Sequence, residues 1–370
     1  MKLLLLSDLN SIHTKRWTQS LSAAGLELCV FGIEACTDNF YQTLPNVTTG
    51  SSSGKARKRG TFSKLFYLSS LRNLREVYRE FKPDIVHAHY ASSYGLLGSV
   101  LKHRPYFISV WGSDVYDFPQ KNWFNRKLLI RNLNRADVIC STGETMALET
   151  QKYTEKKIHV IPFGVDTGLF KPSADLNNQT NAPFTFGIVK SLERHYGIDL
   201  LIRAFAVLAH RFPTKALRLI IAGDGSLFTE LKKLAVDIGV AEHVNFTGRV
   251  AHQLLPACLN QMDVVVVPSE RESFGVAAIE ASACEKPVIV SNVGGLPEVV
   301  LDGETGIVLE NRTAELLAKK MEFLMLNPES SNKMGKKGRQ NVMAKYEWSN
   351  NVSEMIRLYE RSLGLSAANG

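Results

Sequence analysis

Short runs of apolar residues recur along the chain, and most of them end in a polar or glycine-bearing loop. In the first half these runs predict strands at residues 3–7, 27–32, 85–89, 106–110, 137–140 and 160–162. In the second half they predict strands at 184–189, 218–222, 244–247, 264–267 and 287–290. Helical spacing separates most of them, for example at 14–24, 64–82, 197–212 and 228–238. Alternating strands and helices of this kind predict parallel sheets with a helix layer on each face.

The alternation breaks once, at residues 171–182, where the chain is polar and rich in turn formers. We therefore expect two domains, at 1–170 and 183–346, with residues 171–182 as the linker. The chain has 370 residues, which is long enough for two such cores. An amphipathic pattern over residues 347–364 predicts a final helix. Residues 48–60 are rich in serine, glycine and basic side chains, and we expect a loop there.

The composition, 45% hydrophobic and 22% charged, is that of a soluble globular protein. Apolar runs such as residues 3–6 and 264–267 are far too short to span a membrane, and the first of them is also too short for a signal peptide. The five cysteines are scattered without a C-x-x-C pair, so neither a zinc site nor a disulfide framework is indicated. A reducing, cytoplasmic location is expected.

The net charge of +8 is partly local. Between Lys55 and Lys82 nine basic residues stand against only two acids, Glu76 and Glu80. One interpretation is a solvated helix face beside a basic loop. The other is a patch that docks on an anionic membrane surface. Nucleic acid is not an expected partner, because the basic residues lack the interleaved aromatics of a single-strand groove and no recognition motif is present.

The stretch 268–298 combines two carboxylates with a Phe-Gly turn between two predicted strands. A helix that begins after Gly275 offers unpaired backbone amides and the positive end of its dipole, which suits a diphosphate. Glu272 precedes this helix and Glu280 lies on it. A carboxylate accepts hydrogen bonds from vicinal hydroxyls, and two carboxylates eight residues apart would serve two ends of one ligand. The alternative is that Glu272 is solvated and Glu280 caps a neighbouring amide.

This stretch resembles the E-x7-E segment of the retaining family-4 glycosyltransferases of the GT-B fold. Four other motifs are similar to that family: IPFGVD at 161–166, IAGDG at 221–225, FTGRV at 246–250 and DGETG at 302–306. The resemblance runs over nearly the whole chain. It implies two Rossmann-like, doubly wound parallel-sheet α/β domains that face each other across a cleft. The first would bind the acceptor, the second the nucleotide-sugar donor, and the final helix would cross back to the first domain.

The resemblance also implies roles for residues of the second half. Glu280 would hold the ribose hydroxyls of the donor, and Glu272 the hydroxyls of the donor sugar. The remaining donor-binding positions are the backbone amides that receive the diphosphate, the residues that border the base, and the glycine of the second-domain loop: Ser273, Phe274, Gly275, Val276, Arg249, Val250 and Gly223.

Positive charge is needed where the diphosphate departs, because negative charge builds on it as the sugar gains oxocarbenium character. Lys190 stands where the family uses an arginine, and Arg194 is the nearest candidate for the second cation, although it could equally be an exposed loop residue. Tyr196 occupies the position of the usual lysine, unless the loop carries one extra residue. No D-x-D-like pair ends a strand, so we expect no metal and no other cofactor.

The first half departs further from the family. Trp111 stands where many relatives have a histidine, and Asp114 follows it. His89 shares one face of a strand with His87, which is typical of a packed core pair but also fits contact with a substrate. On the acceptor side we expect His13, Ser11, Trp111 and Asp114.

The sequence therefore predicts a metal-independent, retaining glycosyltransferase. It would transfer a sugar from a nucleotide-sugar, with a UDP-sugar expected, to a saccharide or lipid-linked acceptor in bacterial-type polysaccharide or glycoconjugate synthesis. The alternatives are a nucleotide-sugar epimerase of the same fold and a non-catalytic nucleotide-binding protein. The expected location is the cytoplasm, peripheral to the inner face of the cell membrane.

Overall fold

The computed structural model describes residues 1–52, 63–173 and 182–365. The chain divides into two compact units. Unit 1 comprises Met1–Pro162 together with Asn350–Gly370, and unit 2 comprises Phe163–Ser349. The chain thus passes from unit 1 to unit 2 between Pro162 and Phe163, whereas the sequence predicts a linker at residues 171–182.

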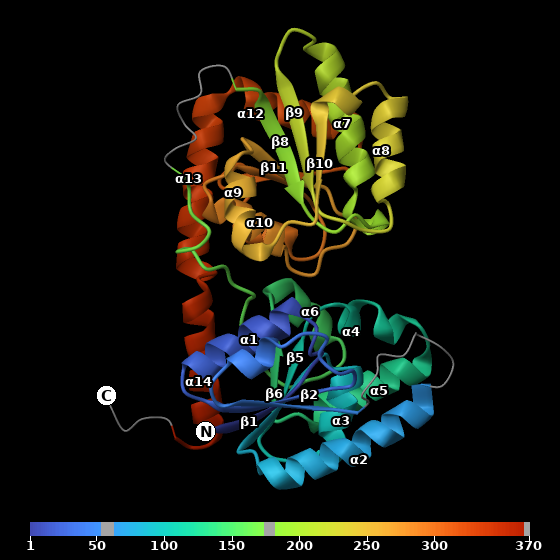
Figure 1. The fold of residues 1–370 in the computed structure, drawn as a ribbon, viewed down its shortest axis with the longest axis vertical. Coiled ribbons are helices and arrows are strands. Elements are labelled where there is room, and N and C mark those ends of the chain that lie inside the picture. Colours follow the sequence, from blue (N-terminus) through green and yellow to red (C-terminus); the bar gives the residue numbers. More distant parts are fainter. Residues whose placement is uncertain (53–62, 174–181, 366–370) are drawn as a thin grey trace. The chain divides into compact units, whose positions relative to one another are not determined.

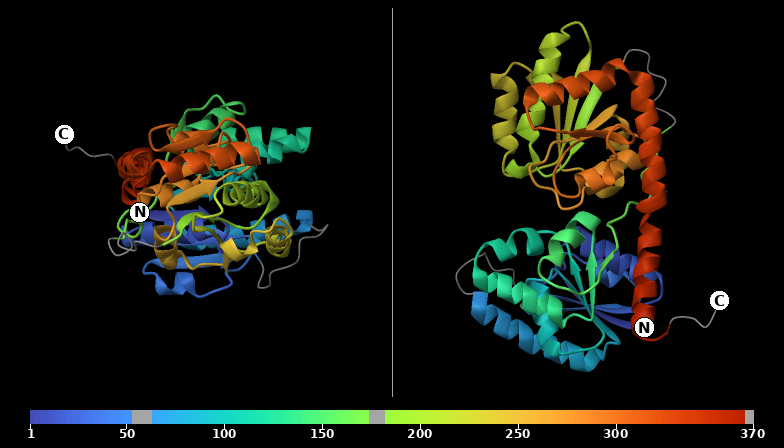
Figure 2. Two further views of the ribbon diagram at one scale, coloured as in Figure 1. Left: turned by 90° about the horizontal axis from the view of Figure 1, so that it is seen from above. Right: turned by 180° about the vertical axis from the view of Figure 1, so that it is seen from behind.

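Unit 1 is built on a parallel sheet of seven strands in the order β3-β2-β1-β4-β5-β6-β7, with helices on both faces (Figures 1 and 2). The strands are β1 (Lys2–Leu6), β2 (Glu27–Gly32), β3 (Val47–Ser51), β4 (Ile85–His89), β5 (Tyr106–Val110), β6 (Val138–Ser141) and β7 (Ile158–Val160). The helices are α1 (Ile12–Ala23), α2 (Ser63–Phe81), α3 (Ser93–Leu101), α4 (Ser113–Tyr116), α5 (Trp123–Arg135), α6 (Glu144–Gln151) and the greater part of α14 (Trp348–Ser362).

The centre of this sheet is apolar throughout, as expected for parallel strands that are covered on both faces. Leu3, Leu4, Leu5 and Leu6 of β1 are all fully buried. β1 pairs with β2 on one side and with β4 on the other. The strand order therefore reverses between β1 and β4: β2 and β3 are added on one side of β1, and β4 to β7 on the other.

The expectation of a loop from residue 48 was wrong at its start, because β3 pairs in parallel with β2 there. β3 reads VTTGS and lies at the sheet edge, so it carries no apolar signal that a pattern search could detect. Residues 53–62 of the predicted loop lie outside the described residues.

Unit 2 is built on a parallel sheet of six strands in the order β10-β9-β8-β11-β12-β13. The strands are β8 (Phe184–Val189), β9 (Leu217–Ala222), β10 (Val244–Gly248), β11 (Val264–Val267), β12 (Val288–Ser291) and β13 (Gly306–Leu309). The helices are α7 (Ile198–Arg211), α8 (Phe228–Asp237), α9 (Leu255–Asn260), α10 (Val276–Ala283), α11 (Leu296–Val299), α12 (Ala314–Leu326) and α13 (Pro328–Lys345).

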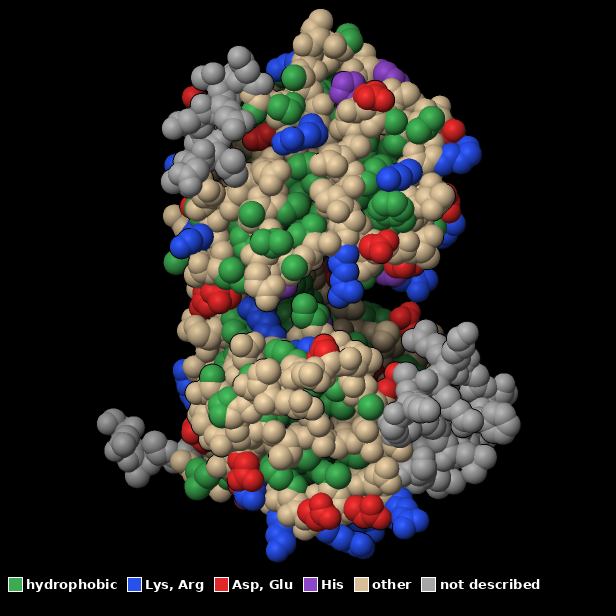
Figure 3. Space-filling view, viewed as in Figure 1, with side chains coloured by type: hydrophobic (Ala, Val, Ile, Leu, Met, Phe, Trp, Pro, Cys, Tyr) green, Lys and Arg blue, Asp and Glu red, His purple; other side chains and the backbone are tan. Residues whose placement is uncertain are grey.

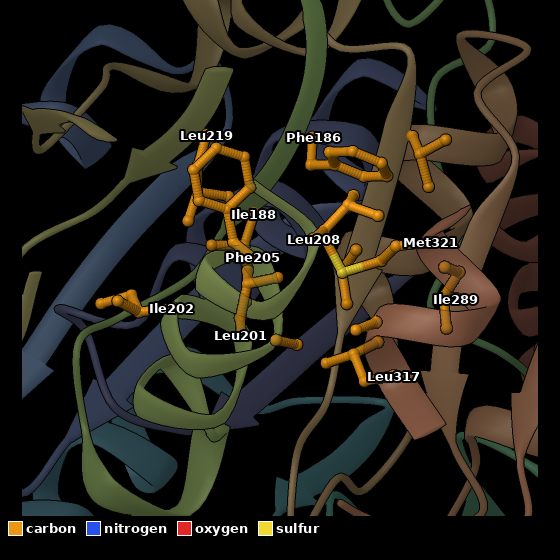
Figure 4. Close-up of a cluster of buried hydrophobic side chains, with 14 of the residues drawn as sticks. Phe186, Ile188, Leu201, Ile202, Phe205, Leu208, Leu219, Ile289, Leu317 and Met321 are labelled. Atoms are coloured by element: carbon orange, nitrogen blue, oxygen red, sulfur yellow. The ribbon is translucent and has the colours of Figure 1, made fainter. Parts of the chain in front are cut away.

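Figure 4 shows how α7 is fixed to this sheet. Phe205 and Leu208 of α7 pack with Phe186 of β8 and with Met321 of α12, and all four side chains are fully buried. This packing fixes the helix that follows the β8 loop. β8, the first strand of the unit, lies between β9 and β11. The strand order reverses there, so a topological switch point lies between β8 and β11.

Candidate functional site

Lys190 and Glu272 meet at this switch point. Lys190 directly follows β8, and Glu272 lies in the loop between β11 and α10. Lys190 Nζ lies 2.6 Å from Glu272 Oε2, and the two side chains are only 14% and 11% exposed. The same ammonium lies 4.4 Å from the centre of the Tyr196 ring, a cation–π contact. A ligand with both phosphate and hydroxyl groups could engage the ammonium and the carboxylate separately.

Two glycines hold the backbone on either side of this ion pair. A Cβ at Gly223 would lie 1.8 Å from the carbonyl oxygen of Lys190, and one at Gly294 would lie 1.7 Å from that of Glu272. Both glycines also have positive φ, +152° and +53°. Only glycine permits such close approach, so these positions fix where the two charged side chains begin.

The amino end of α10 follows the loop that carries Glu272. Gly275 is its N-cap and, as a glycine, provides no side-chain cap. Phe274 is 2% exposed, and its ring packs edge-on against Phe163 and Tyr346, with centroids 6.1 Å and 5.7 Å away. The phenylalanine therefore anchors the turn from inside, while the helix dipole favours an anion at its start. Glu280 lies on α10 and is 7% exposed.

A pocket of about 460 Å³ adjoins the ion pair. Four residues predicted from the sequence are among those that line it: Lys190, Gly223, Arg249 and Val250. The lining also contains Asp224 and Leu255, for which sequence reasoning gave no role. The pocket thus joins the loops after β8, β9 and β10. Glu280 and residues 273–276 are not part of its lining.

Two arginines differ from what the sequence indicated. The side chain of Arg194 is 79% exposed, and its nearest acidic partner is Glu230, 3.9 Å away. Arg312 was not predicted at all. Its Nε donates to the carbonyl oxygen of Pro268 at 3.0 Å, and its guanidinium lies 3.3 Å from Glu270. Arg312 therefore fastens the start of the Glu272 loop. Nothing in the sequence marks it, because it follows β13, 44 residues from its partner.

In unit 1, His87 and His89 lie side by side in a buried polar network. His87 contacts the Tyr359 hydroxyl at 2.6 Å through Nδ1 and the Ser109 hydroxyl at 2.8 Å through Nε2. His89 Nδ1 lies 3.0 Å from the Ser7 hydroxyl. Burial lowers the pKa of His87 to about 3, and it lowers the pKa of His89 well below its ordinary value. Both imidazoles are therefore neutral near pH 7. Contact of His89 with a substrate stays a prediction.

The other first-half residues gather at the ends of β1, β4 and β5. Trp111 is 7% exposed and stacks near His89, with ring centroids 4.2 Å apart, and His13 lies 5.9 Å away at its edge. Asp114 is 1% exposed and accepts backbone hydrogen bonds from Ala91, Trp111 and Gly112. Burial raises its pKa, and these amides counteract the shift.

Asp114 thus joins the loop after β4 to the loop after β5, which is a structural task. Ser11 is the N-cap residue of α1 and is partly exposed. Acceptor contacts for Ser11, His13, Trp111 and Asp114 stay predictions. Within residues 1–52, 63–173 and 182–365, no three His, Cys, Asp or Glu side chains group in a way that could hold a metal ion.

Comparison with known proteins places the chain. The family model "Glycosyl transferases group 1" matches residues 174–341, and "Glycosyl transferase 4-like" matches residues 2–143. The chain therefore resembles glycosyltransferases over both of its halves. Its fold is the GT-B fold predicted from the sequence: sucrose-phosphate synthase from Thermosynechococcus elongatus aligns over 99% of this chain and 100% of its own, with a TM-score of 0.85 at 22% identity.

Two curated relatives have named substrates. A GDP-mannose-dependent alpha-(1-6)-phosphatidylinositol monomannoside mannosyltransferase of Mycolicibacterium smegmatis is 34% identical over 211 residues, which cover 54% of this chain and 55% of that protein. The match thus spans about half of that enzyme. A D-inositol 3-phosphate glycosyltransferase of Corynebacterium aurimucosum is 26% identical over 356 residues, which cover 86% of this chain and 81% of that protein.

Proposed function

We propose that this protein is a glycosyltransferase that moves a sugar from a nucleoside-diphosphate sugar to a hydroxyl of a saccharide or lipid-linked acceptor, with retention at the anomeric carbon. The observation that carries the proposal is the Lys190–Glu272 pair at the switch point of unit 2, beside a pocket of nucleotide size. In open α/β sheets, ligands bind at the carboxyl ends of the strands at such a point.

In the proposed reaction the bond from the anomeric carbon to the diphosphate oxygen breaks, a bond to the acceptor oxygen forms, and the proton of the acceptor hydroxyl passes to the departing diphosphate. Lys190 and the first amides of α10 stabilise the negative charge on the departing diphosphate. Glu272 accepts hydrogen bonds from hydroxyls of the transferred sugar, and Glu280 from those of the ribose. Arg249 and Val250 border the base, while Arg194, at the exposed edge, is the weaker candidate for a second cation.

The donor base is the first point to test. The sequence predicts a UDP-sugar, whereas the mycobacterial relative uses GDP-mannose. A thermal-shift panel of UDP, GDP and their sugar conjugates identifies the ligand, because specific binding raises the midpoint of unfolding by mass action. Shifts with neither nucleotide would contradict the proposed donor class.

Two substitutions test the site during turnover. Glu272→Gln and Lys190→Ala should each lower kcat/KM on the order of 100-fold, because each removes a preorganised charge. Lys233→Ala is the matched control, since Lys233 also forms an ion pair, with Asp237, but on the exposed surface of α8. Full activity in both site variants would show that the site is assigned wrongly.

The same assay separates the two alternatives. An epimerase converts the donor without an acceptor, and a binding protein is stabilised by nucleotide but forms no product. Only a transferase requires both substrates and yields a glycosylated acceptor. The names of the two relatives make inositol phosphates and phosphatidylinositol glycosides reasonable first acceptors.

Docking of α2 on an anionic membrane is a separate proposal. Arg72, Arg75, Arg79 and Lys82 are exposed, but Glu76 forms an ion pair with Arg72 at 3.2 Å. Figure 3 shows basic beside acidic side chains along the end of unit 1 where α2 lies. Lys55 and its basic neighbours up to Arg59 lie outside the described residues. Among the residues that are described, no helix is long and apolar enough to cross a membrane.

Sedimentation with anionic vesicles tests this docking. Arg75→Glu/Arg79→Glu should weaken binding at low salt, because each basic side chain near the surface contributes about 1 kcal/mol. Unchanged binding of this variant would remove α2 from the contact surface.

A further inference from the structure

Two large aromatic side chains stand exposed at the start of α5. Trp123 is 69% exposed and Phe124 is 61% exposed, and their ring centroids lie 6.3 Å apart in an edge-on arrangement. Burial of either ring would remove a large apolar surface from water, which is favourable. A pair of such rings left exposed on a stable helix therefore indicates a contact surface.

The helix that presents the pair is firmly fixed. Asn122 caps the helix, because its side-chain oxygen accepts a hydrogen bond from the backbone N–H of Asn125 at 2.9 Å. Further along the helix, Leu129 and Leu133 are fully buried in the core of unit 1. The opposite face of α5 therefore holds the aromatic rings outward, and they are not part of a frayed end.

The charged residues of the chain segment that carries the rings are all basic. From residue 118 to residue 135 the chain contains five basic residues and no Asp or Glu: Lys121, Arg126, Lys127, Arg131 and Arg135, all exposed. Trp123, Lys127 and Arg131 follow one another at four-residue spacing and so share one side of the helix. The Lys127 ammonium lies 4.7 Å from the centre of the Trp123 ring.

We propose that this surface, the α5 face (Trp123, Phe124, Lys127, Arg131 and Arg135), docks on an anionic lipid bilayer and places the aromatic pair among the headgroups. Trp and Phe favour the membrane–water interface, and basic side chains beside them add attraction to anionic lipid. The edge-on rings on a convex helix form no stacking platform of the kind that binds single-stranded nucleic acid. The proposal rests on neither sugar transfer nor the charges of α2.

The tryptophans of the chain provide a specific probe. Of the four, Trp17, Trp111 and Trp348 are 4%, 7% and 9% exposed, so Trp123 alone lies in water. With vesicles of phosphatidylcholine and phosphatidylglycerol, the fluorescence of the full chain should shift to shorter wavelength. Trp123→Phe keeps an aromatic ring, so it should still bind the vesicles but lose the shift.

Matched variants test each part of the α5 face by vesicle sedimentation. Trp123→Ala/Phe124→Ala should weaken partitioning about tenfold or more, whereas Val236→Ala/Leu254→Ala, which removes exposed apolar groups from unit 2, should not. Lys127→Glu/Arg131→Glu should lose binding at low salt by roughly fivefold or more per residue. Lys333→Glu/Lys336→Glu, the same change on exposed lysines of α13, should retain it.

Thermal unfolding of each variant shows that the fold is kept, since all the changed side chains are exposed. The proposal is overturned if anionic vesicles neither bind the chain nor shift its fluorescence, or if the shift persists in Trp123→Phe. Equal binding to neutral vesicles would also overturn it. So would competition by single-stranded RNA for the α5 face with no lipid binding.

Discussion

At the scale of single residues, Gly294 decides where the carboxylate of Glu272 can lie. Its missing side chain leaves room for the Glu272 carbonyl, which a Cβ would approach to 1.7 Å. The loop and the charged group it carries are therefore fixed by a residue that has no chemistry of its own.

We predict that Gly294→Ala abolishes most of the nucleotide-induced thermal shift, because the Glu272 loop must move to accept the methyl group. The matched control is Gly239→Ala, which has a similar positive φ of +74° but open space around its Cβ. An alanine in the left-handed region lowers the free energy of unfolding by about 1–2 kcal/mol, and this cost is similar in both variants. The control should show this loss of stability and keep the nucleotide-induced shift. A full nucleotide shift in Gly294→Ala would show that the close contact does not shape the site.

At the scale of elements, α14 is joined to the sheet of unit 1 by the hydrogen bond between Tyr359 and His87. The Tyr359 side chain is 1% exposed, and its ring also packs against Phe107 at 5.1 Å. The imidazole is thus a structural part of the joint and must be neutral to stay there.

This joint predicts a loss of stability in acid. His87 has a pKa of about 3 when folded, against about 6.5 when unfolded, so between these values only the unfolded chain takes up the proton. Its contribution is fully present above about pH 6.5 and is lost as the pH falls towards 3, by about 1.4 kcal/mol per pH unit. The lowered pKa of His89 acts in the same direction.

Denaturant unfolding at pH 7.5, 6 and 5 measures the slope. His87→Gln should flatten it, since glutamine does not titrate in this range, whereas the exposed His243→Gln should leave it unchanged. Identical slopes for wild type and His87→Gln would mean that protonation of His87 does not govern acid stability.

At the scale of the whole molecule, we predict that sugar transfer proceeds without a divalent metal. Lys190 and the amino end of α10 provide positive charge where the diphosphate is expected to depart. Turnover should be the same after dialysis against EDTA and after addition of Mg²⁺ or Mn²⁺. Activity that EDTA removes and a metal restores would contradict this.

Much of this organisation was accessible from the sequence. Most of the buried strands of both sheets were predicted because parallel strands read as continuous apolar runs, as in residues 264–267. The short edge strand β13 was not predicted, although Ile307 and Leu309 are buried. β3 was missed because an edge strand needs no such run. Lys190, Glu272 and the α10 turn came from motifs that a family resemblance made specific.

The sequence alone determined the alternation of strands and helices, and with it the order of loops that carry the candidate chemistry. Only the tertiary structure decided which side chains meet. The Lys190–Glu272 contact spans 82 residues, and the Arg312 clamp spans 44. Such contacts depend on strand order, which places β8 beside β11, and no local pattern encodes that neighbourhood. Exposure was decided in the same way, because the packing of α5 leaves Trp123 in water while that of β5 buries Trp111.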